Sequence, residues 1–382
     1  MSKYVIDGLF LTQTMTGIQR YAYELTHELD KIISPHAIEI LVPKDAEVAS
    51  DYQNIKLVRY GSFHGILWEQ IDFAHYARKN KAECICLTNV LPLLYAHGIV
   101  TIHDICYKVN PHFFTSKRDQ VSALWHRLNY WRAVHSSMDI LTDSIFSRTE
   151  LEKYYKVASE RVTILYCGWQ HMERIAAAAD TFEKYPELHK GRYYFSMSTL
   201  GANKNFKWLL YAAKNNPEVQ IAIAGGGKLK GAAEAEGFAD LPNIHFLGYV
   251  SDADAKTLMA NGKAFVFPTM YEGFGLTPLE AVSCGALRIV VSDTPCMHEV
   301  YGDNAEYIDQ TDYKNAKIAE NGKLVSKELL EKYSWKKSAD IAMAQISDKN
   351  YAKAFADDGR KVVKVGINFS ENQRSIEDWV IE

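Results

Sequence analysis

Short runs of apolar residues alternate with longer amphipathic stretches along most of the chain. Such alternation is typical of parallel α/β layers, in which buried strands read as continuous apolar runs. In the first half the pattern predicts strands near 3–7, 38–43, 56–60, 83–88, 99–103, 139–143 and 161–166. In the second half it predicts strands near 193–198, 219–224, 244–248, 263–267, 287–292 and 305–308.

The alternation is interrupted between Gln170 and Arg192 by an alanine run followed by charged and proline residues. A chain of 382 residues with 47% hydrophobic content is also too long for one ordinary domain. We therefore expect an α/β protein with two doubly wound parallel sheets, at 1–170 and 192–348, that face each other across a cleft. Residues 171–191 would link them, and 349–382 would be an addition.

Composition and charge exclude several classes of protein. The net charge of −4 gives no general attraction for nucleic acid. No apolar run reaches the roughly 18 residues that span a bilayer. The N-terminus reads as a strand rather than a signal peptide. The six scattered cysteines lack zinc-site spacing, so free thiols in the cytoplasm are expected.

Candidate chemistry is densest just after the strand predicted at 263–267. Glu272 lies on a loop with glycines, and Glu280 stands eight positions later in the next predicted helix. In open parallel sheets ligands bind beyond the carboxyl ends of the strands. Glycines admit a ligand close to the backbone, helix N-termini favour phosphate, and carboxylates accept hydrogen bonds from hydroxyls. A nucleotide sugar would suit this arrangement.

A simpler explanation exists for one of the two glutamates. Thr277-Pro278-Leu279-Glu280 has the form of a capping box, with Thr277 as N-cap and Glu280 as its partner. Glu280 can therefore be a helix cap or a ligand-binding residue. Glu272, between an aromatic residue and a glycine, is not needed for capping.

The wider string Glu272-Gly-Phe-Gly-Leu, followed by Leu279-Glu280-Ala281 and Gly285, resembles the signature of the retaining glycosyltransferases of family 4. The segment 292–305 is similar to that family too, and the resemblance covers roughly residues 1 to 345. It implies a fold of the GT-B type, with the acceptor bound by the N-terminal half and a nucleotide-sugar donor by the C-terminal half.

The resemblance also implies roles for individual residues. Glu272 would bind the donor sugar, Glu280 the ribose, and the backbone after the third strand of the second half the base. The residues expected to act in catalysis are His103, Lys204 and Glu272. The residues expected to bind the donor are Gly17, Thr199, Lys204, Gly225, Tyr249, Val250, Glu272, Gly273, Phe274, Gly275, Leu276 and Glu280.

Two of these positions have ordinary alternatives. Lys204 can neutralise a departing diphosphate, all the more because the family commonly has an arginine where this chain has Thr199. It could equally be a solvated residue of a first helical turn. His103 ends a strand, and the resemblance places it beside the transferred sugar, where its ring could bond a hydroxyl. A lone histidine can also simply be packed.

The remaining candidates of the N-terminal half are less sharply indicated. Gly17 is what remains of the family's usual glycine pair, and Trp68-Glu69-Gln70 resembles a string near the acceptor in some members, although Trp68 could be a core residue. Basic and aromatic residues mix between Ser116 and Arg132. They predict a helix that either packs on its own sheet or lies on an anionic membrane.

We therefore expect a metal-independent, cofactor-free retaining enzyme that moves a hexose or deoxyhexose to a sugar or lipid-linked saccharide. It would act in cell-surface polysaccharide synthesis, either free in the cytoplasm or as a peripheral protein on the inner face of the plasma membrane. The resemblance implies that retention follows from front-face attack with the leaving phosphate as base, and the sequence offers no obvious second carboxylate nucleophile. The alternatives are an oxidoreductase, whose Gly-x-Gly-x-x-Gly turn is lacking near Gly8 and Gly201, and a non-catalytic nucleotide-sugar-binding protein. The tail 349–382 resembles the end of a restriction-endonuclease-like domain.

Overall fold

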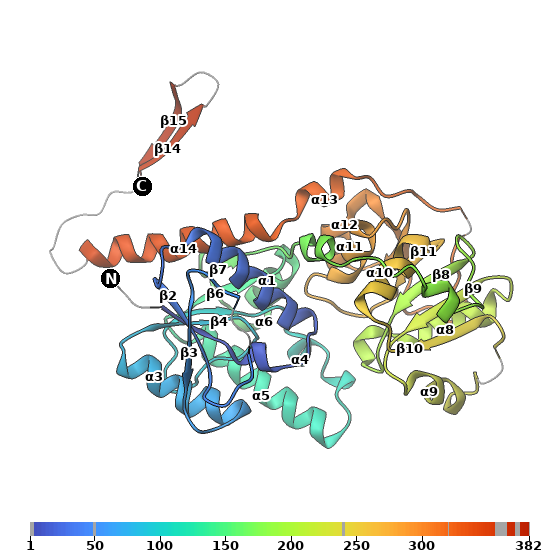
Figure 1. Ribbon diagram of the computed structural model, residues 1–382, viewed down its shortest axis with the longest axis horizontal. Coiled ribbons are helices and arrows are strands. Elements are labelled where there is room, and N and C mark those ends of the chain that lie inside the picture. The colour runs from blue at the N-terminus through green and yellow to red at the C-terminus, as the bar shows by residue number, and fades with distance from the viewer. Residues whose placement is uncertain are drawn as a thin grey trace.

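The computed structural model describes residues 4–48, 51–238, 241–319, 321–355, 365–370 and 375–381, with side chains to residue 346. Two α/β domains lie side by side (Figure 1), and each has a parallel sheet with helices on both faces. Within the described part of the chain, no helix is both long and apolar enough to cross a membrane.

The N-terminal domain is built on a seven-stranded sheet of order β3-β2-β1-β4-β5-β6-β7, in which all neighbours are parallel. Its strands are β1 (Tyr4–Asp7), β2 (Ile38–Pro43), β3 (Lys56–Tyr60), β4 (Glu83–Cys86), β5 (Gly98–Thr101), β6 (Asp139–Thr142) and β7 (Val162–Ile164). Cys84 and Cys86 belong to one core cluster on the same face of β4, and all six cysteines are free.

The C-terminal domain has a six-stranded parallel sheet of order β10-β9-β8-β11-β12-β13. Its strands are β8 (Tyr193–Met197), β9 (Gln220–Ala224), β10 (Ile244–Gly248), β11 (Ala264–Phe267), β12 (Ile289–Ser292) and β13 (Glu306–Ile308). The thirteen predicted strands and the two doubly wound sheets are confirmed. Their continuous apolar runs reflect burial on both faces, as in β11 and β12, which are buried throughout.

Helices connect the strands in nearly every crossover. The α-helices are α1 (Gly17–Ile32), α2 (Gly65–Leu67), α3 (Ala74–Lys79), α4 (Cys106–Val109), α5 (Lys117–Val134), α6 (Ile145–Tyr155), α7 (Thr181–Lys184), α8 (Phe206–Asn215), α9 (Leu229–Ala235), α10 (Asp252–Asn261), α11 (Leu276–Ser283), α12 (Pro295–Tyr301), α13 (Glu328–Lys332) and α14 (Trp335–Phe355). The other turns of helix are 3₁₀, namely η1 (Leu9–Thr12), η3 (Pro111–Phe113), η4 (Ser159–Arg161), η5 (Gln170–Arg174), η6 (Ala202–Lys204) and η7 (Gly302–Asn304), except for the π-helix η2 (Trp68–Phe73).

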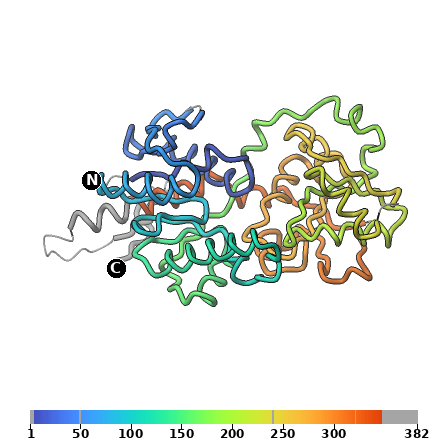
Figure 2. The backbone as a smooth tube through the Cα atoms, turned by 90° about the horizontal axis from the view of Figure 1, so that it is seen from below, coloured from blue at the N-terminus to red at the C-terminus, as the bar shows by residue number. Residues whose placement is uncertain are grey.

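The chain passes between the domains twice. It leaves the N-terminal domain at η5, as the green segment in Figure 2, and returns with α14, which packs against α1. Four apolar side chains at the start of α14 are buried, namely those of Trp335, Ala339, Ala342 and Ile346, and Ser338 is buried beside them. The last described helix of the C-terminal half therefore completes the N-terminal domain.

The tail contains an antiparallel pair, β14 (Val365–Ser370) and β15 (Ser375–Ile381). Residues 356–364 and 371–374 lie outside the described residues. The resemblance of 349–382 to a restriction-endonuclease-like domain, and the domain boundaries given above, stay predictions.

Candidate active site in the interdomain cleft

Two adjoining cavities open in the cleft between the domains. The larger cavity, about 430 Å³, is lined by Met15, Thr16, Gly17, Arg20, Met197, Ser198, Thr199, Lys204, Ala224, Gly225, Gly226, Tyr249, Val250, Asp252, Phe267, Leu276, Thr277 and Glu280. The smaller cavity, about 320 Å³, is lined by Thr16, Gly17, Ile18, Tyr21, His103, Asp104, Asp143, Cys167, Asn203, Lys204 and residues 272–276. Each cavity is lined by residues of both domains, so a ligand bound in it would contact the N-terminal and the C-terminal domain.

Every predicted site residue lies on these walls. Gly17, Lys204 and Leu276 line both cavities. The larger cavity adds Thr199, Gly225, Tyr249, Val250 and Glu280, and the smaller adds His103, Glu272, Gly273, Phe274 and Gly275. The structure brings these residues together, while the role of each stays a prediction.

The loop before α11 is shaped by its glycines. Gly275 has φ of 79° and is the N-cap residue of α11, which begins at Leu276. A Cβ on Gly273 would overlap the backbone carbonyl oxygen of His103 in the other domain. The capping box that explained Glu280 as a cap is therefore wrong, because Thr277 already lies inside the helix and no side chain caps it.

Glu272 and Lys204 form an ion pair on the wall of the smaller cavity. Lys204 Nζ lies 2.7 Å from Glu272 Oε1, with side chains 31% and 14% exposed. Burial raises the pKa of Glu272, and the Lys204 ammonium offsets part of that rise. Lys204 is therefore not a freely solvated lysine. It presents a positive charge where the two cavities meet.

His103 is held by both of its ring nitrogens. Nδ1 lies 2.8 Å from Asp143 Oδ2 and Nε2 lies 3.0 Å from the Leu87 carbonyl oxygen. Burial lowers the pKa of His103, but the Asp143 carboxylate and its hydrogen bond outweigh this and leave the pKa raised. The predicted bond from the ring to a sugar hydroxyl would require one of these partners to be released.

Glu280 is bonded to a histidine that the sequence did not single out. His171 Nε2 lies 2.9 Å from Glu280 Oε1, and the Trp335 indole donates to His171 Nδ1 at 3.1 Å. His171 is on η5 and Trp335 opens α14, so both belong to the crossover segments. Neither has a motif of its own, and only the fold places them beside the cleft.

Besides Asp143, sequence reasoning missed three further charged residues on the cavity walls, namely Arg20, Asp104 and Asp252. Arg20, three positions beyond Gly17, lies 3.5 Å from Asp252 across the larger cavity. Asp104, next to His103, lines the smaller cavity, and burial raises its pKa. The adjacency of these residues to predicted ones was the available signal. With Glu272, Asp104 and Asp143, the smaller cavity has three carboxylates on its walls, two of which the sequence did not make obvious.

Contacts across the cleft hold the domains closed on each other. The Ser144 hydroxyl donates to the Gly273 carbonyl oxygen at 2.5 Å. Both oxygens of Glu299, on α12, accept hydrogen bonds of 2.7 Å from the Ile145 and Phe146 amides at the start of α6. A carboxylate at a helix N-terminus is favourable because it meets unpaired amides and the positive end of the helix dipole.

The two accounts of Trp68 are separated by its burial. Trp68 is fully buried, and its indole donates to the Tyr60 carbonyl oxygen, so it is a core residue. Among the described residues, no group of three or more His, Cys, Asp or Glu side chains is placed to hold a metal ion.

Residues 178–362, just under half of the chain, match the family model described as "Glycosyl transferases group 1". The chain is also similar to "O-antigen chain mannosyltransferase B" of Escherichia coli, with 30% identity over 242 residues. That alignment covers 58% of this chain and 60% of the relative, so the chain spans about three fifths of its relative's length.

Solved structures share the architecture. Sucrose-phosphate synthase (tll1590) from Thermosynechococcus elongatus has a TM-score of 0.68 at 15% identity, over 92% of this chain and 99% of that one. Anabaena Alr3699/HepE in complex with UDP has a TM-score of 0.62 at 15% identity, over 91% of this chain and 100% of that one. The likeness at this identity shows the fold, the predicted GT-B arrangement of two parallel-sheet domains.

Proposed function

We propose that this protein transfers a hexose, with mannose as the first candidate, from a nucleotide-diphosphate sugar to a saccharide in cell-surface polysaccharide synthesis. The observation that carries the proposal is the gathering of Lys204, Glu272 and Glu280 on one wall of the cleft, within the segment that matches the group 1 glycosyltransferase model. Mannose and the polysaccharide come from the name of the Escherichia coli relative. The family match favours transfer over the oxidoreductase alternative, and the charged residues favour it over mere binding.

In this proposal the donor lies along both cavities. The nucleoside occupies the larger cavity, with Glu280 at the ribose and the 249–250 backbone at the base. Lys204 neutralises the diphosphate, and Glu272 accepts hydrogen bonds from the sugar in the smaller cavity. The bond between the anomeric carbon and the diphosphate oxygen breaks, and the acceptor oxygen bonds to that carbon. The acceptor's proton passes to the departing diphosphate.

Retention of configuration, without a metal, is the finer part of the proposal. Front-face attack needs no enzyme nucleophile, whereas a double displacement would need a carboxylate such as Asp104. NMR of the first product gives the anomeric configuration, and Asp104→Asn separates the two routes. Activity should survive EDTA, because Lys204 supplies the positive charge. Loss on chelation that magnesium or manganese restores would contradict metal independence.

A lipid-linked acceptor and contact with a membrane are also proposed, on the basis of α5. This helix buries one side, including Ala123, Tyr130 and Ala133, on its own sheet. Its outer side exposes an apolar stripe at Val121, Leu124, Leu128 and Trp131, and the helix bears exposed basic residues at Lys117, Arg118 and Arg127. Apolar side chains flanked by basic ones fit the surface of an anionic bilayer.

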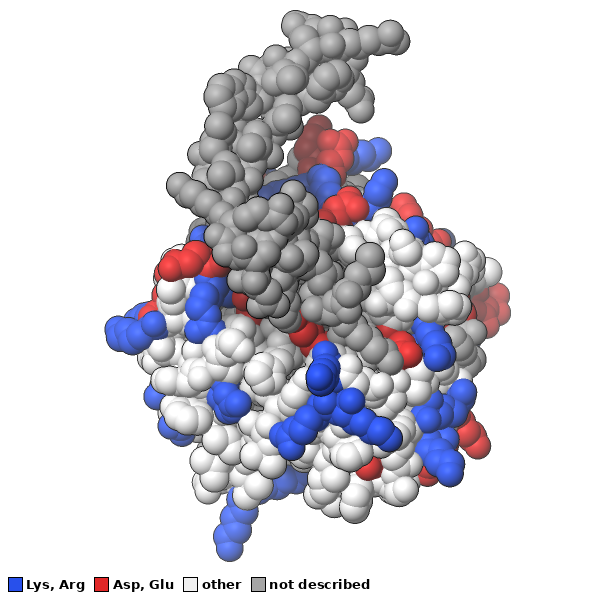
Figure 3. All heavy atoms as spheres, turned by 90° about the vertical axis from the view of Figure 1, so that its left-hand side faces the viewer, with Lys and Arg blue, Asp and Glu red and all other residues white. Residues whose placement is uncertain are grey.

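Neighbouring segments extend this surface. Arg132 donates to the Leu93 carbonyl oxygen, and Gln70 on η2 bonds to the backbone of Leu91 and Leu93. Leu94 is 81% exposed. Figure 3 views the N-terminal domain end-on, and Lys and Arg stand among uncharged side chains over its lower half.

The decisive experiment is a donor screen. Uridine-, guanosine- and thymidine-diphosphate sugars are tested for protection of the protein against heat unfolding, and the protective ones are then tested for transfer to a mannosylated acceptor. Protection by one nucleotide sugar with turnover supports the proposal. Absence of protection by every nucleotide sugar at millimolar concentration would reject it.

A further inference from the structure

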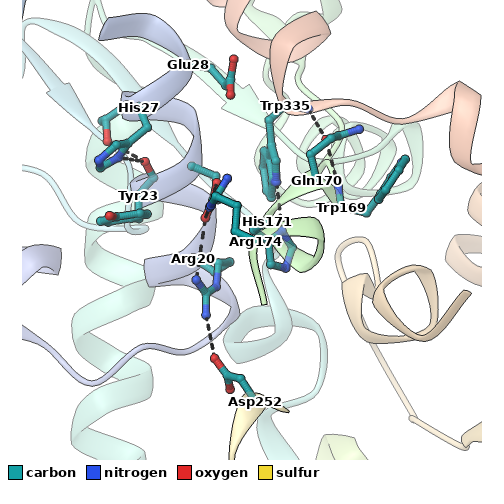
Figure 4. Close-up of polar contacts among 12 residues, drawn as sticks. Arg20, Tyr23, His27, Glu28, Trp169, Gln170, His171, Arg174, Asp252 and Trp335 are labelled. Carbon is teal, nitrogen blue, oxygen red and sulfur yellow. Dashed lines mark hydrogen bonds and ion pairs between the residues drawn. The ribbon is translucent and has the colours of Figure 1, made fainter. Parts of the chain in front are cut away.

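The two crossover segments are bonded to each other at the base of the cleft. The Gln170 amide accepts from the Trp335 backbone N–H at 3.1 Å and donates to the Tyr333 carbonyl oxygen at 3.2 Å. A Cβ on Gly168 would overlap the Trp335 backbone nitrogen, so the two segments are in direct contact. Figure 4 shows η5 and the start of α14 side by side.

His171 lies inside this junction and is 1% exposed. An indole N–H can only donate, so the bond from Trp335 requires an unprotonated Nδ1 on His171. The remaining ring proton is then on Nε2, which donates to Glu280 Oε1 at 2.9 Å. The tryptophan thus selects the tautomer that holds the carboxylate.

The same turn reaches the opposite wall of the larger cavity. Arg174, at the end of η5, donates to both carboxylate oxygens of Glu24, at 2.5 and 2.7 Å. Glu24 is 1% exposed and lies 3.7 Å from Arg20, which in turn meets Asp252 (Figure 4). One short turn therefore anchors charged groups on both walls of this cavity.

We propose that His171 is the positioning residue for Glu280, and that it presents this carboxylate to the ribose hydroxyls of the donor only while the two crossover segments are joined. The inference rests on the proposed function and deepens it. A hydrogen bond to one carboxylate oxygen fixes the orientation of the glutamate side chain before the ligand binds. Binding then costs less side-chain entropy than it would with a freely rotating glutamate. Recognition of the ribose is thereby linked to the hinge between the domains.

The test compares binding of UDP and GDP with that of their 2′,3′-dideoxy forms by calorimetry. In the wild-type protein, loss of the hydroxyls should weaken binding about 10- to 100-fold, as expected for hydrogen bonds to a charged group. In His171→Phe the ratio of the Kd of the dideoxy form to that of the ordinary nucleotide should fall to about threefold or less. The variant keeps a ring at this position but loses the hydrogen bonds of the imidazole. His171→Gln, which can still donate, should recover part of the ratio.

His245→Phe is the matched control. His245 also bonds a side-chain oxygen, Gln220 Oε1 at 2.8 Å, but it lies on β10 outside both cavities. It should keep the wild-type ratio. If His171→Phe does not fold, the same Kd ratio is measured for His171→Gln and Trp335→Phe.

The two hypotheses fail differently. If the wild-type protein binds neither nucleotide, the proposed function is wrong. If it distinguishes the two forms and the His171 variants do so equally well, the positioning role is overturned while the proposed function stands.

Discussion

At the scale of single residues, the two glutamates of the site were predictable and their partners were not. Glu272 and Glu280 stand in a string that resembles a family signature, so the sequence sufficed to select them. Nothing local could assign Lys204 to the first or His171 to the second, because 68 and 109 positions separate these partners. Such pairs depend on how the two domains meet, which no short window of sequence contains.

Replacement of Glu272 should remove transfer and leave the fold intact. In Glu272→Gln we expect kcat to fall about 100- to 1000-fold, the usual range for loss of one preorganised electrostatic group, with Tm nearly unchanged. The control is Glu236→Gln, which disrupts a Lys207–Glu236 pair of the same 2.7 Å length outside the two cavities. Near-normal turnover of Glu272→Gln would exclude this residue from the site.

A buried acid pair predicts an unusual dependence of stability on pH. Asp7 and Glu69 are both 3% exposed. Burial raises the pKa of Glu69 from its ordinary 4.5, and repulsion by the Asp7 carboxylate raises it further. The folded protein therefore holds a proton that the unfolded chain releases, and stability should fall as the pH rises from about 4.5 through the raised pKa.

Glu69→Gln should remove this loss. Thermal unfolding is followed between pH 5 and 8, and the variant should gain Tm over the wild type progressively as the pH rises, with little difference at pH 5. A gain that is constant across this range would mean that Glu69 is not protonated in the folded protein.

At the scale of elements, the strands were predictable and the helix ends were not. A strand buried on both faces can be recognised in the sequence as a run of apolar residues, as at 289–292. The start of α11, in contrast, depends on backbone geometry. Thr277-Pro278 has the composition of a helix start, yet Gly275 adopts a left-handed conformation and the helix begins two residues earlier. The conformational freedom of glycine overrode the side-chain signal.

The outward stripe of α5 makes a prediction about membranes. The wild-type protein should sediment with vesicles that contain phosphatidylglycerol, and high salt or pure phosphatidylcholine should weaken this. Leu124→Asp should reduce binding about tenfold, because it removes one buried apolar side chain from the contact. The control is Leu287→Asp, since Leu287 is 69% exposed on the other domain and Leu124 is 67% exposed. Equal loss in both variants would argue against a specific surface.

At the scale of the whole molecule, the closed cleft depends on close approach of backbones. Gly273 has no room for a side chain against the His103 carbonyl. Gly273→Ala should therefore keep the domains apart and lower kcat/KM about 100-fold, since misplacement of about 1 Å is costly in catalysis. Small-angle scattering should show a larger radius of gyration.

Gly231→Ala provides the comparison, because a Cβ on Gly231, in α9, meets nothing within 4 Å. It should leave rate and scattering unchanged. A fully active Gly273→Ala protein would show that this closed arrangement is not required for transfer.

Truncation separates the packed part of α14 from the tail. A chain that ends at residue 348 lacks the end of α14 but retains its buried side chains up to Ile346, and it should transfer at a rate within a few fold of the full chain. A chain that ends at residue 334 lacks Trp335 and should lose about 3–5 kcal/mol or more of unfolding free energy. Unfolding in urea and transfer assays of both chains check this. A soluble but inactive 348-residue chain would place the tail in the catalytic machinery.

The return of α14 to the N-terminal domain also sets an order of events on the ribosome. Helix α1 is synthesised early, but α14, which packs against it, is synthesised only after all the strands of the second sheet. At about 5–20 residues per second, the segment between Ile32 at the end of α1 and Trp335 at the start of α14 takes on the order of 15 to 60 seconds to emerge. During that interval the nascent N-terminal domain exposes an apolar face, which makes it a client for chaperones until translation is nearly complete.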